Sequence, residues 1–120
     1  MKNENRNLRL IIDSLEDSKA KNIKAIDIRN LTTIAYYFVI ASGTSVTHIK
    51  ALNDNLVKKL SENGLEPLRI EGYNHARWIL LDYGDIIVHI FHEEDREYYG
   101  LERLWQDGKS VDFRGLAETI

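Results

Sequence analysis

Asp82 and Asp85 are the two side chains whose type and spacing most invite a chemical interpretation, because neighbouring carboxylates can hold Mg²⁺ in a nucleotidyl-transfer site. They flank Tyr83-Gly84, and a glycine between two apolar runs indicates a short hairpin turn. Acids that straddle a turn as D-Y-G-D do not project side by side from one strand, as the acids of a D-x-D pair do. The spacing therefore predicts no catalytic residue here.

His89 and His92 form an H-x-x-H pair, a spacing that invites a metal site. On a strand, residues three apart point to opposite faces, and the chain has no cysteine to complete a set of three or four ligands. We therefore expect neither a metal nor a cofactor.

The segment Ser42-Gly43-Thr44-Ser45 lies between a predicted strand and a predicted helix, where backbone N–H groups can bind an anion. It lacks the longer glycine spacing of a phosphate-binding loop. A helix start needs small capping residues in any case, so a structural use is favoured.

The stretch from Trp78 to Phe91 predicts a β-hairpin whose two faces differ chemically. With a turn centred on Tyr83-Gly84, Trp78 lies opposite His89, and Asp82 lies opposite Asp85. One face is aliphatic and is expected to be buried; it consists of Ile79, Leu81, Ile86, Val88 and Ile90. The other face is mixed; it consists of Trp78, Leu80, Asp82, Asp85, Ile87 and His89.

The mixed face has two interpretations that the residues alone leave open. Opposed carboxylates repel each other, which favours a basic partner docked against this face. Alternatively, the acids cap the turn and Trp78 packs beneath a helix.

The elements that position this hairpin follow from periodicity and from capping residues. Apolar side chains at helical spacing predict amphipathic helices over residues 5–20 and 45–63, the second ending at Gly64. Strands are expected over 23–28, 36–41 and 68–71, and a partly helical stretch over 93–106 is loosened at Gly100. We expect one α/β domain over 1–108, with a mixed β-sheet and flanking helices, and a loosely ordered tail over 109–120.

Composition limits the classes of function. The 120 residues carry a net charge of −3, include no cysteine and contain no apolar run long enough to span a membrane, so we expect a cytoplasmic protein. Residues 1–65 hold ten Lys and Arg against seven Asp and Glu, a net +3, whereas residues 66–107 hold four against ten, a net −6. This acidity argues against nucleic-acid binding by the hairpin region. It fits a basic protein surface as partner, and it equally fits an ordinary solvated acidic surface.

Several motifs in order resemble the ribosomal silencing factors, also called iojap-like proteins. They are Tyr37-Phe38-Val39-Ile40-Ala41-Ser42-Gly43-Thr44-Ser45, Glu71-Gly72, the whole of Trp78 to Phe91, Arg96, Tyr99-Gly100-Leu101-Glu102 and Leu104-Trp105. The resemblance covers residues 8 to 112. The family usually has an acidic residue immediately before the Tyr-Phe-Val-Ile run, where this chain has Tyr36.

The resemblance implies a domain related to nucleotidyltransferases but lacking their catalytic carboxylates, and hence a protein that is not an enzyme. It also implies binding to a large-ribosomal-subunit protein at the subunit interface, number fourteen in the bacterial series, which blocks joining of the small subunit and represses translation when nutrients are short. The free protein is expected to form a homodimer in some family members. Two alternatives are a divergent metal-dependent nucleotidyltransferase and a dimeric scaffold protein.

We expect the partner-binding residues to lie on the hairpin. Trp78 and Leu80 are the predicted apolar anchors, Asp82 and Asp85 the predicted partners of lysine or arginine, Tyr83 a residue of the docking tip, and His89 a peripheral contact.

Overall fold

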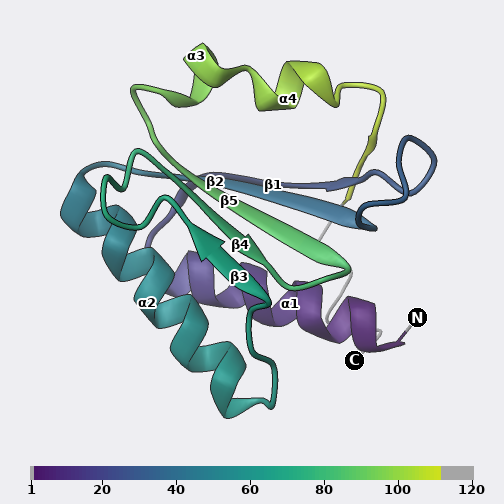
Figure 1. Cartoon of the computed structure of the whole chain (residues 1–120), viewed down its shortest axis with the longest axis horizontal. Helices are drawn as coiled ribbons and strands as arrows, with labels where there is room; N and C mark the ends of the chain where they lie inside the picture. Colours follow the sequence, from purple (N-terminus) through teal and green to yellow (C-terminus); the bar gives the residue numbers. More distant parts are fainter. Residues whose placement is uncertain (1, 112–120) are drawn as a thin grey trace.

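A single mixed β-sheet forms the centre of the molecule (Figure 1). The computed structural model describes residues 2–111. The six strands lie in the order β3-β4-β5-β2-β1-β6. Their bounds are β1 Lys21–Asp27, β2 Tyr37–Gly43, β3 Arg69–Glu71, β4 Trp78–Asp82, β5 Ile86–His92 and β6 Lys109–Ser110. The single α/β domain with a mixed sheet and flanking helices is thus confirmed.

Two long helices, α1 (Lys2–Asp17) and α2 (Val46–Glu62), cover one face of the sheet (Figure 1). The cap of α2 is the one its sequence predicts, because the Ser45 hydroxyl accepts the N–H of His48 at 3.0 Å. At the other end Gly64 has a φ of +81°, and Leu65 N–H donates to the carbonyl of Leu60 at 2.9 Å. Both ends of the predicted helix are therefore explained by local chemistry.

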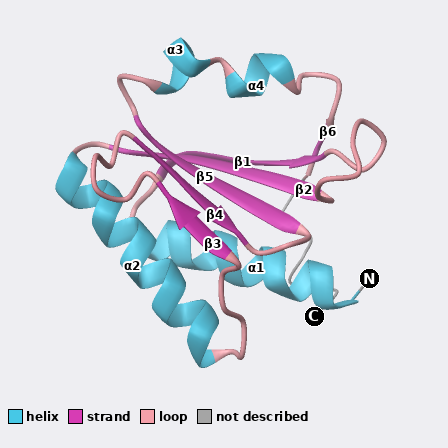
Figure 2. Cartoon of the chain, viewed as in Figure 1, coloured by secondary structure: helices cyan, strands magenta, loops and turns pink. Residues whose placement is uncertain are grey.

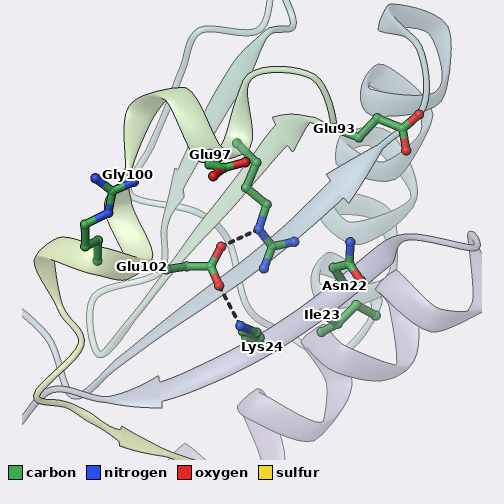
Figure 3. A pocket seen from close by; sticks show the side chains of 9 residues that line it. Asn22, Ile23, Lys24, Glu93, Glu97, Gly100 and Glu102 are labelled. Carbon is green, nitrogen blue, oxygen red and sulfur yellow. Dashed lines mark hydrogen bonds and ion pairs between the residues drawn. The ribbon is translucent and has the colours of Figure 1, made fainter.

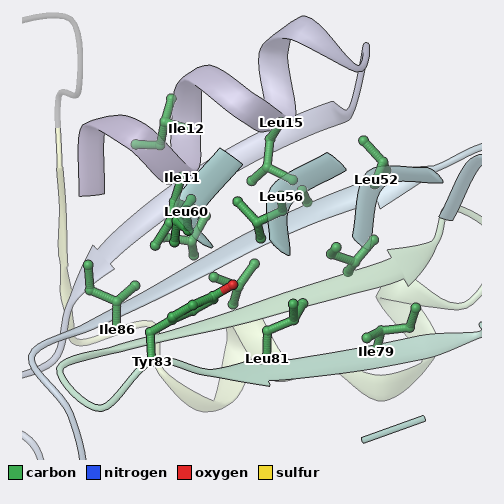
Figure 4. Packing of buried hydrophobic residues seen from close by; sticks show 14 of the residues in the cluster. Ile11, Ile12, Leu15, Leu52, Leu56, Leu60, Ile79, Leu81, Tyr83 and Ile86 are labelled. Atoms are coloured by element: carbon green, nitrogen blue, oxygen red, sulfur yellow. The ribbon is translucent and has the colours of Figure 1, made fainter. Parts of the chain in front are cut away.

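The main core lies between these helices and the sheet (Figure 4). Ile11 and Leu15 of α1 and Leu56 of α2 have no exposed surface, and they pack over Leu81 of β4. The apolar face of each helix thus packs against the apolar face of the sheet in one layer, as the sequence predicts.

The parallel pairing of β2 with β5 runs through the middle of the sheet. All seven residues of β2 are buried, and so are all seven of β5. The expected buried strand over 36–41 is confirmed, with bounds one residue later at its start and two later at its end.

The hairpin of β4 and β5 differs in register from the sequence-based expectation. Trp78 lies opposite Phe91, and Asp82 lies opposite Ile87, so the expected pairings of Trp78 with His89 and of Asp82 with Asp85 are wrong. The partner of each residue has moved by two positions.

The turn itself explains this shift. Tyr83 N–H donates to the carbonyl of Ile86 at 2.9 Å, so Gly84 and Asp85 are the two central residues. Gly84 has a φ of +86°, and glycine at the first central position is the arrangement of a type II′ hairpin turn. Because the partners move by an even number, each strand side chain keeps the face that the sequence predicted for it.

The second face of the sheet is covered in part by two short helices, α3 (Arg96–Tyr99) and α4 (Leu101–Leu104). Figure 2 shows that loops connect this pair to β5 and to β6. Gly100 separates them in the left-handed conformation, with a φ of +63°. Gly100, which we expected to loosen a partly helical segment, therefore divides that segment into two separate helices.

The sheet continues past the domain boundary expected at residue 108. Lys109 pairs with Asp27 on β1, and Val111 N–H donates to the carbonyl of Ala25 at 2.8 Å. The remainder of the expected tail, residues 112–120, lies outside the described residues.

Candidate protein-docking surface

The face of β4 that points away from α1 and α2 is only partly covered. Trp78, Leu80 and Asp82 alternate with Ile79 and Leu81, which have no exposed surface, whereas the first three are half-buried. A row of half-buried apolar side chains beside an acid is what a protein interface presents before it is occupied. This row is the part of the predicted mixed face that a partner can reach.

Trp78 is held in one orientation by its neighbours. Its indole Nε1–H donates to Nδ1 of His89 at 3.1 Å. The ring stacks on Phe91, with centroids 4.9 Å apart, and contacts Tyr99 of α3, with centroids 4.8 Å apart. An aromatic anchor that is already ordered loses little conformational entropy when a partner binds.

His89 lies beneath this anchor and is only 3% exposed. Burial lowers its pKa to about 4, so the imidazole is neutral near pH 7. Because Nδ1 accepts a hydrogen bond from the indole N–H, the neutral ring carries its own proton on Nε2. His89 therefore positions Trp78 from below, and the expected peripheral contact with a partner is not available in this structure.

The two hairpin acids do different things. The Asp82 carboxylate accepts the N–H of Gly84 at 2.8 Å and lies 3.4 Å from the guanidinium of Arg69. Asp85 is exposed at the turn, and its backbone carbonyl accepts the N–H groups of Tyr36 and Tyr37. The carboxylates do not face each other across the hairpin, so they form no side-by-side pair that would hold a metal ion.

Tyr83 is on the other side of the hairpin from Trp78. It is 8% exposed and belongs to the core beneath α1 and α2. Burial, assisted by the negative charge of Glu66, raises its pKa to about 12. Its side chain is thus part of the core in this structure and does not line the docking tip we expected.

Two parts of this surface were not expected from the sequence. Arg69 and Glu71 of β3 lie directly opposite Asp82 and Leu80, and directly paired residues share a face. Tyr99 is 43% exposed beside Trp78. Tyr98 and Tyr99 are adjacent in the sequence, and the structure shows that Tyr99 contacts Trp78 whereas Tyr98 is 85% exposed. We define the docking patch as Arg69, Glu71, Trp78, Leu80, Asp82 and Tyr99.

The segment from Ser42 to Ser45 serves the fold. The Ser42 hydroxyl accepts a hydrogen bond from Arg96 Nη1 at 2.9 Å, and Ser45 caps α2. A Cβ on Gly43 would lie 2.7 Å from Cγ1 of Ile49, so glycine permits α2 to pack closely against β2. Structural use, as the sequence favoured, accounts for these residues.

Within residues 2–111, no group of three or more His, Cys, Asp or Glu side chains is placed to hold a metal ion. His92 is the last residue of β5 and is buried, and its Nδ1 accepts the N–H of Glu94 at 3.2 Å. In the same part of the chain, no helix is long and apolar enough to cross a membrane.

Known proteins share this fold and sequence. A crystal structure of a protein from Chromobacterium violaceum superposes with a TM-score of 0.82 at 36% identity and covers 84% of each chain. One from Bacillus halodurans gives 0.78 at 37% identity, covering 88% of this chain and 95% of the other. The chain is therefore a single-domain mixed α/β protein of the fold that these two structures display.

The sequence comparisons specify the family. The family model described as "Ribosomal silencing factor during starvation" matches residues 1–119. A ribosomal silencing factor of Halalkalibacterium halodurans is 39% identical over 109 residues, which are 91% of this chain and 93% of that protein. A mouse protein named "Mitochondrial assembly of ribosomal large subunit protein 1" is 34% identical over 99 residues, which are 80% of this chain but 43% of that protein. This chain belongs to the ribosomal silencing factor family.

Proposed function

We propose that this protein binds the large ribosomal subunit at the subunit interface and keeps the small subunit from joining, so that translation falls when nutrients are short. Membership of the ribosomal silencing factor family supports the silencing role, and the name of the mouse relative refers to the large subunit. Cytoplasmic ribosomes are the proposed site of action.

The observation that carries the proposal is the half-buried Trp78. A tryptophan that contacts His89, Phe91 and Tyr99 and is still partly exposed has the features of a binding hot spot. Leu80, next along β4 on the same face, extends the apolar area. These two side chains are the proposed anchors.

Charge supports a basic protein as the partner. Residues 66–107, which include the whole docking patch, carry a net charge of −6. Asp85 at the hairpin tip is exposed, whereas the charge of Asp82 is partly balanced by Arg69. We propose the basic interface protein that is number fourteen in the bacterial series, with Asp85 as a rim contact that steers association.

The proposed mechanism is steric, and no bond is made or broken. A domain of this size, with Cα dimensions of 34 × 33 × 25 Å, occupies a large area of a subunit interface. Because an occupied surface cannot also receive the small subunit, the fraction of large subunits that carry the protein determines the extent of silencing. A homodimer of the free protein would compete with this binding if it used the same patch.

Co-sedimentation with purified large and small subunits tests the proposal. We expect binding to the large subunit only, and we expect Trp78→Ala to weaken it by about 2 kcal/mol, roughly thirtyfold. The matched control is Glu94→Ala, since Glu94 is an exposed acid outside the patch. Leu80→Ala provides a second variant that leaves the stack around Trp78 in place.

Two results would contradict the proposal. One is equal binding by Trp78→Ala, Leu80→Ala and Glu94→Ala, each shown to be folded by its near-ultraviolet circular dichroism. The other is equal sedimentation of the wild-type protein with both subunits.

A further inference from the structure

A cavity of about 590 Å³ lies between the α3–α4 segment and the beginning of β1 (Figure 3). It is separate from the docking patch, and none of its lining residues belongs to that patch. Its volume lies within the range of small-molecule sites in proteins.

The cavity lies at a reversal in the topology of the sheet. β2 and β5 are adjacent and parallel, so Gly43 and His92 end side by side. After β2 the chain enters α2 on one face, and after β5 it enters α3 on the other (Figure 1). In α/β sheets, such a point at the carboxyl ends of parallel strands is where ligands bind.

Arg96 has a hydrogen-bond donor without a partner in the described part of the chain, and its side chain lies at this cavity. Its side chain is 9% exposed and lines the cavity. Nε donates to Oε1 of Glu102 at 2.7 Å, and Nη1 donates to the hydroxyl of Ser42 at 2.9 Å. Nη2 is buried and has no hydrogen-bond partner among the described residues. A buried, charged donor without an acceptor is costly, and an oxyanion would satisfy it.

The surrounding charges favour one anionic group. Glu102 is shared, because Lys24 Nζ lies 2.8 Å from its other oxygen, and both contacts are drawn as dashed lines in Figure 3. Burial opposes ionisation of Glu102, but the hydrogen bonds from Arg96 and Lys24 outweigh it and lower its pKa. Two cations and one carboxylate leave a net charge of +1 in this inner group.

The rim limits the size of the charge that can enter. Glu93, Glu97 and Arg103 line the cavity and are exposed, so the rim carries a net charge of −1. This negative rim repels a strand of nucleic acid, which would bring several phosphates, but it admits a small molecule with a single acidic head.

We propose that this cavity binds a small metabolite through a carboxylate or phosphate head group, which accepts a hydrogen bond from Nη2 of Arg96. Lys24 provides the second positive charge facing the ligand. The site is independent of the proposed ribosome binding, and either proposal can fail without the other.

Titration of the full-length, ¹⁵N-labelled protein followed by amide chemical shifts tests the site. The probes are inorganic phosphate, acetate and glycine, each added at constant ionic strength against sodium chloride. We expect saturable shifts confined to residues 22–24 and 93–103 with at least one of the probes. Response to phosphate alone would assign a phosphate head, and response to acetate or glycine would assign a carboxylate.

Two substitutions that change the charge of the cavity in opposite directions make the test specific. Arg96→Gln should weaken binding about tenfold or more, the loss of one charge-assisted hydrogen bond. Glu102→Gln should strengthen binding, because two cations then lose their shared carboxylate. Lys58→Gln, an exposed change on α2, should leave the affinity unaltered.

Four results would overturn the proposal. The first is an absence of saturable shifts in the wild-type protein with all three probes, and the second is a response in which chloride produces the same shifts. The third is an unchanged affinity in both Arg96→Gln and Glu102→Gln. If Arg96→Gln does not fold, Glu102→Gln and the wild-type titration still decide the matter. Binding of an RNA oligonucleotide in place of every small anion would also contradict it.

Discussion

His89 is a buried histidine that contacts other side chains of this protein. Its ring is buried beneath Trp78, accepts the indole N–H through Nδ1 and contacts Phe38 edge-on, with ring centroids 4.8 Å apart. Nε2 has no hydrogen-bond partner among the described residues. A neutral imidazole leaves Nδ1 able to accept the indole N–H, whereas an imidazolium would place a second proton on that nitrogen.

We expect the free energy of unfolding to fall as the pH drops from 6.5 toward 4. The pKa of His89 is about 4 in the folded protein because of burial, and 6.5 is its ordinary value, so the unfolded chain takes up the proton first. The contribution is complete above pH 6.5 and is on the order of 3 kcal/mol over the whole range. Below pH 4 this group adds no further loss.

Urea denaturation at several pH values measures this effect. His89→Gln, which keeps an acceptor for the indole but does not titrate, should reduce the pH dependence by about one proton. His75→Gln changes an exposed loop histidine and serves as the control. An unreduced pH dependence in His89→Gln would show that His89 is not the group responsible.

The sequence predicted Trp78, Leu80 and Asp82 on the mixed face of the hairpin, and the structure places all three on one face of β4, where they are half-buried. It did not predict the burial of His89, because alternation assigns a residue to a face but does not say what covers that face. The covering residues, Leu101 and Trp105, come from the segment after the hairpin.

At the scale of elements, the edge of the sheet depends on one close approach of backbone to backbone. Gly72 follows β3 with a φ of +83°, and a Cβ there would lie 2.1 Å from the carbonyl oxygen of Trp78. This contact is possible only for glycine, and it fixes the position of the β4 strand that carries the docking patch.

Gly72→Ala and Gly64→Ala form a matched pair, because the two glycines have nearly equal φ values, +83° and +81°. A Cβ on Gly64 would project into open space, with no neighbouring side chain or backbone within 4 Å, so this substitution costs only the left-handed strain of about 1 kcal/mol. Gly72→Ala adds a steric conflict and should destabilise the protein considerably more.

Chemical denaturation of both variants checks this prediction, and binding to the large subunit should also fall for Gly72→Ala alone. Equal losses of stability in the two variants would mean that β3 and β4 can move apart to accommodate the added Cβ. In that case Gly72 would not fix the position of Trp78.

The helix α2 and the hairpin show which elements could be predicted and which could not. Both ends of α2 are signalled locally by Ser45 and Gly64. The hairpin register depended on where a two-residue turn places its glycine, and a centre one residue away changes every pair. Strand β6 has only two residues, too few for any periodicity, and its pairing with β1 depends on contacts far away in the sequence.

At the scale of the whole molecule, one face of the sheet is closed and the other is divided. α1 and α2 close the first face over a continuous core. The second is covered in part by α3 and α4, leaving the docking patch at the β3–β4 edge and the Arg96 cavity near the carboxyl ends of β2 and β5. Sequence patterns predicted the class of fold, but the order of the strands arises from long-range pairing that no local signal contains.

The central claim is that an occupied docking patch prevents subunit joining, and light scattering of mixed ribosomal subunits measures this directly. Preincubation of large subunits with excess wild-type protein should suppress the rise in scattering when small subunits are added, whereas Trp78→Ala at the same concentration should suppress it much less. Glu94→Ala should act as the wild-type protein does. Normal joining by large subunits that are demonstrably saturated with the wild-type protein would contradict the account.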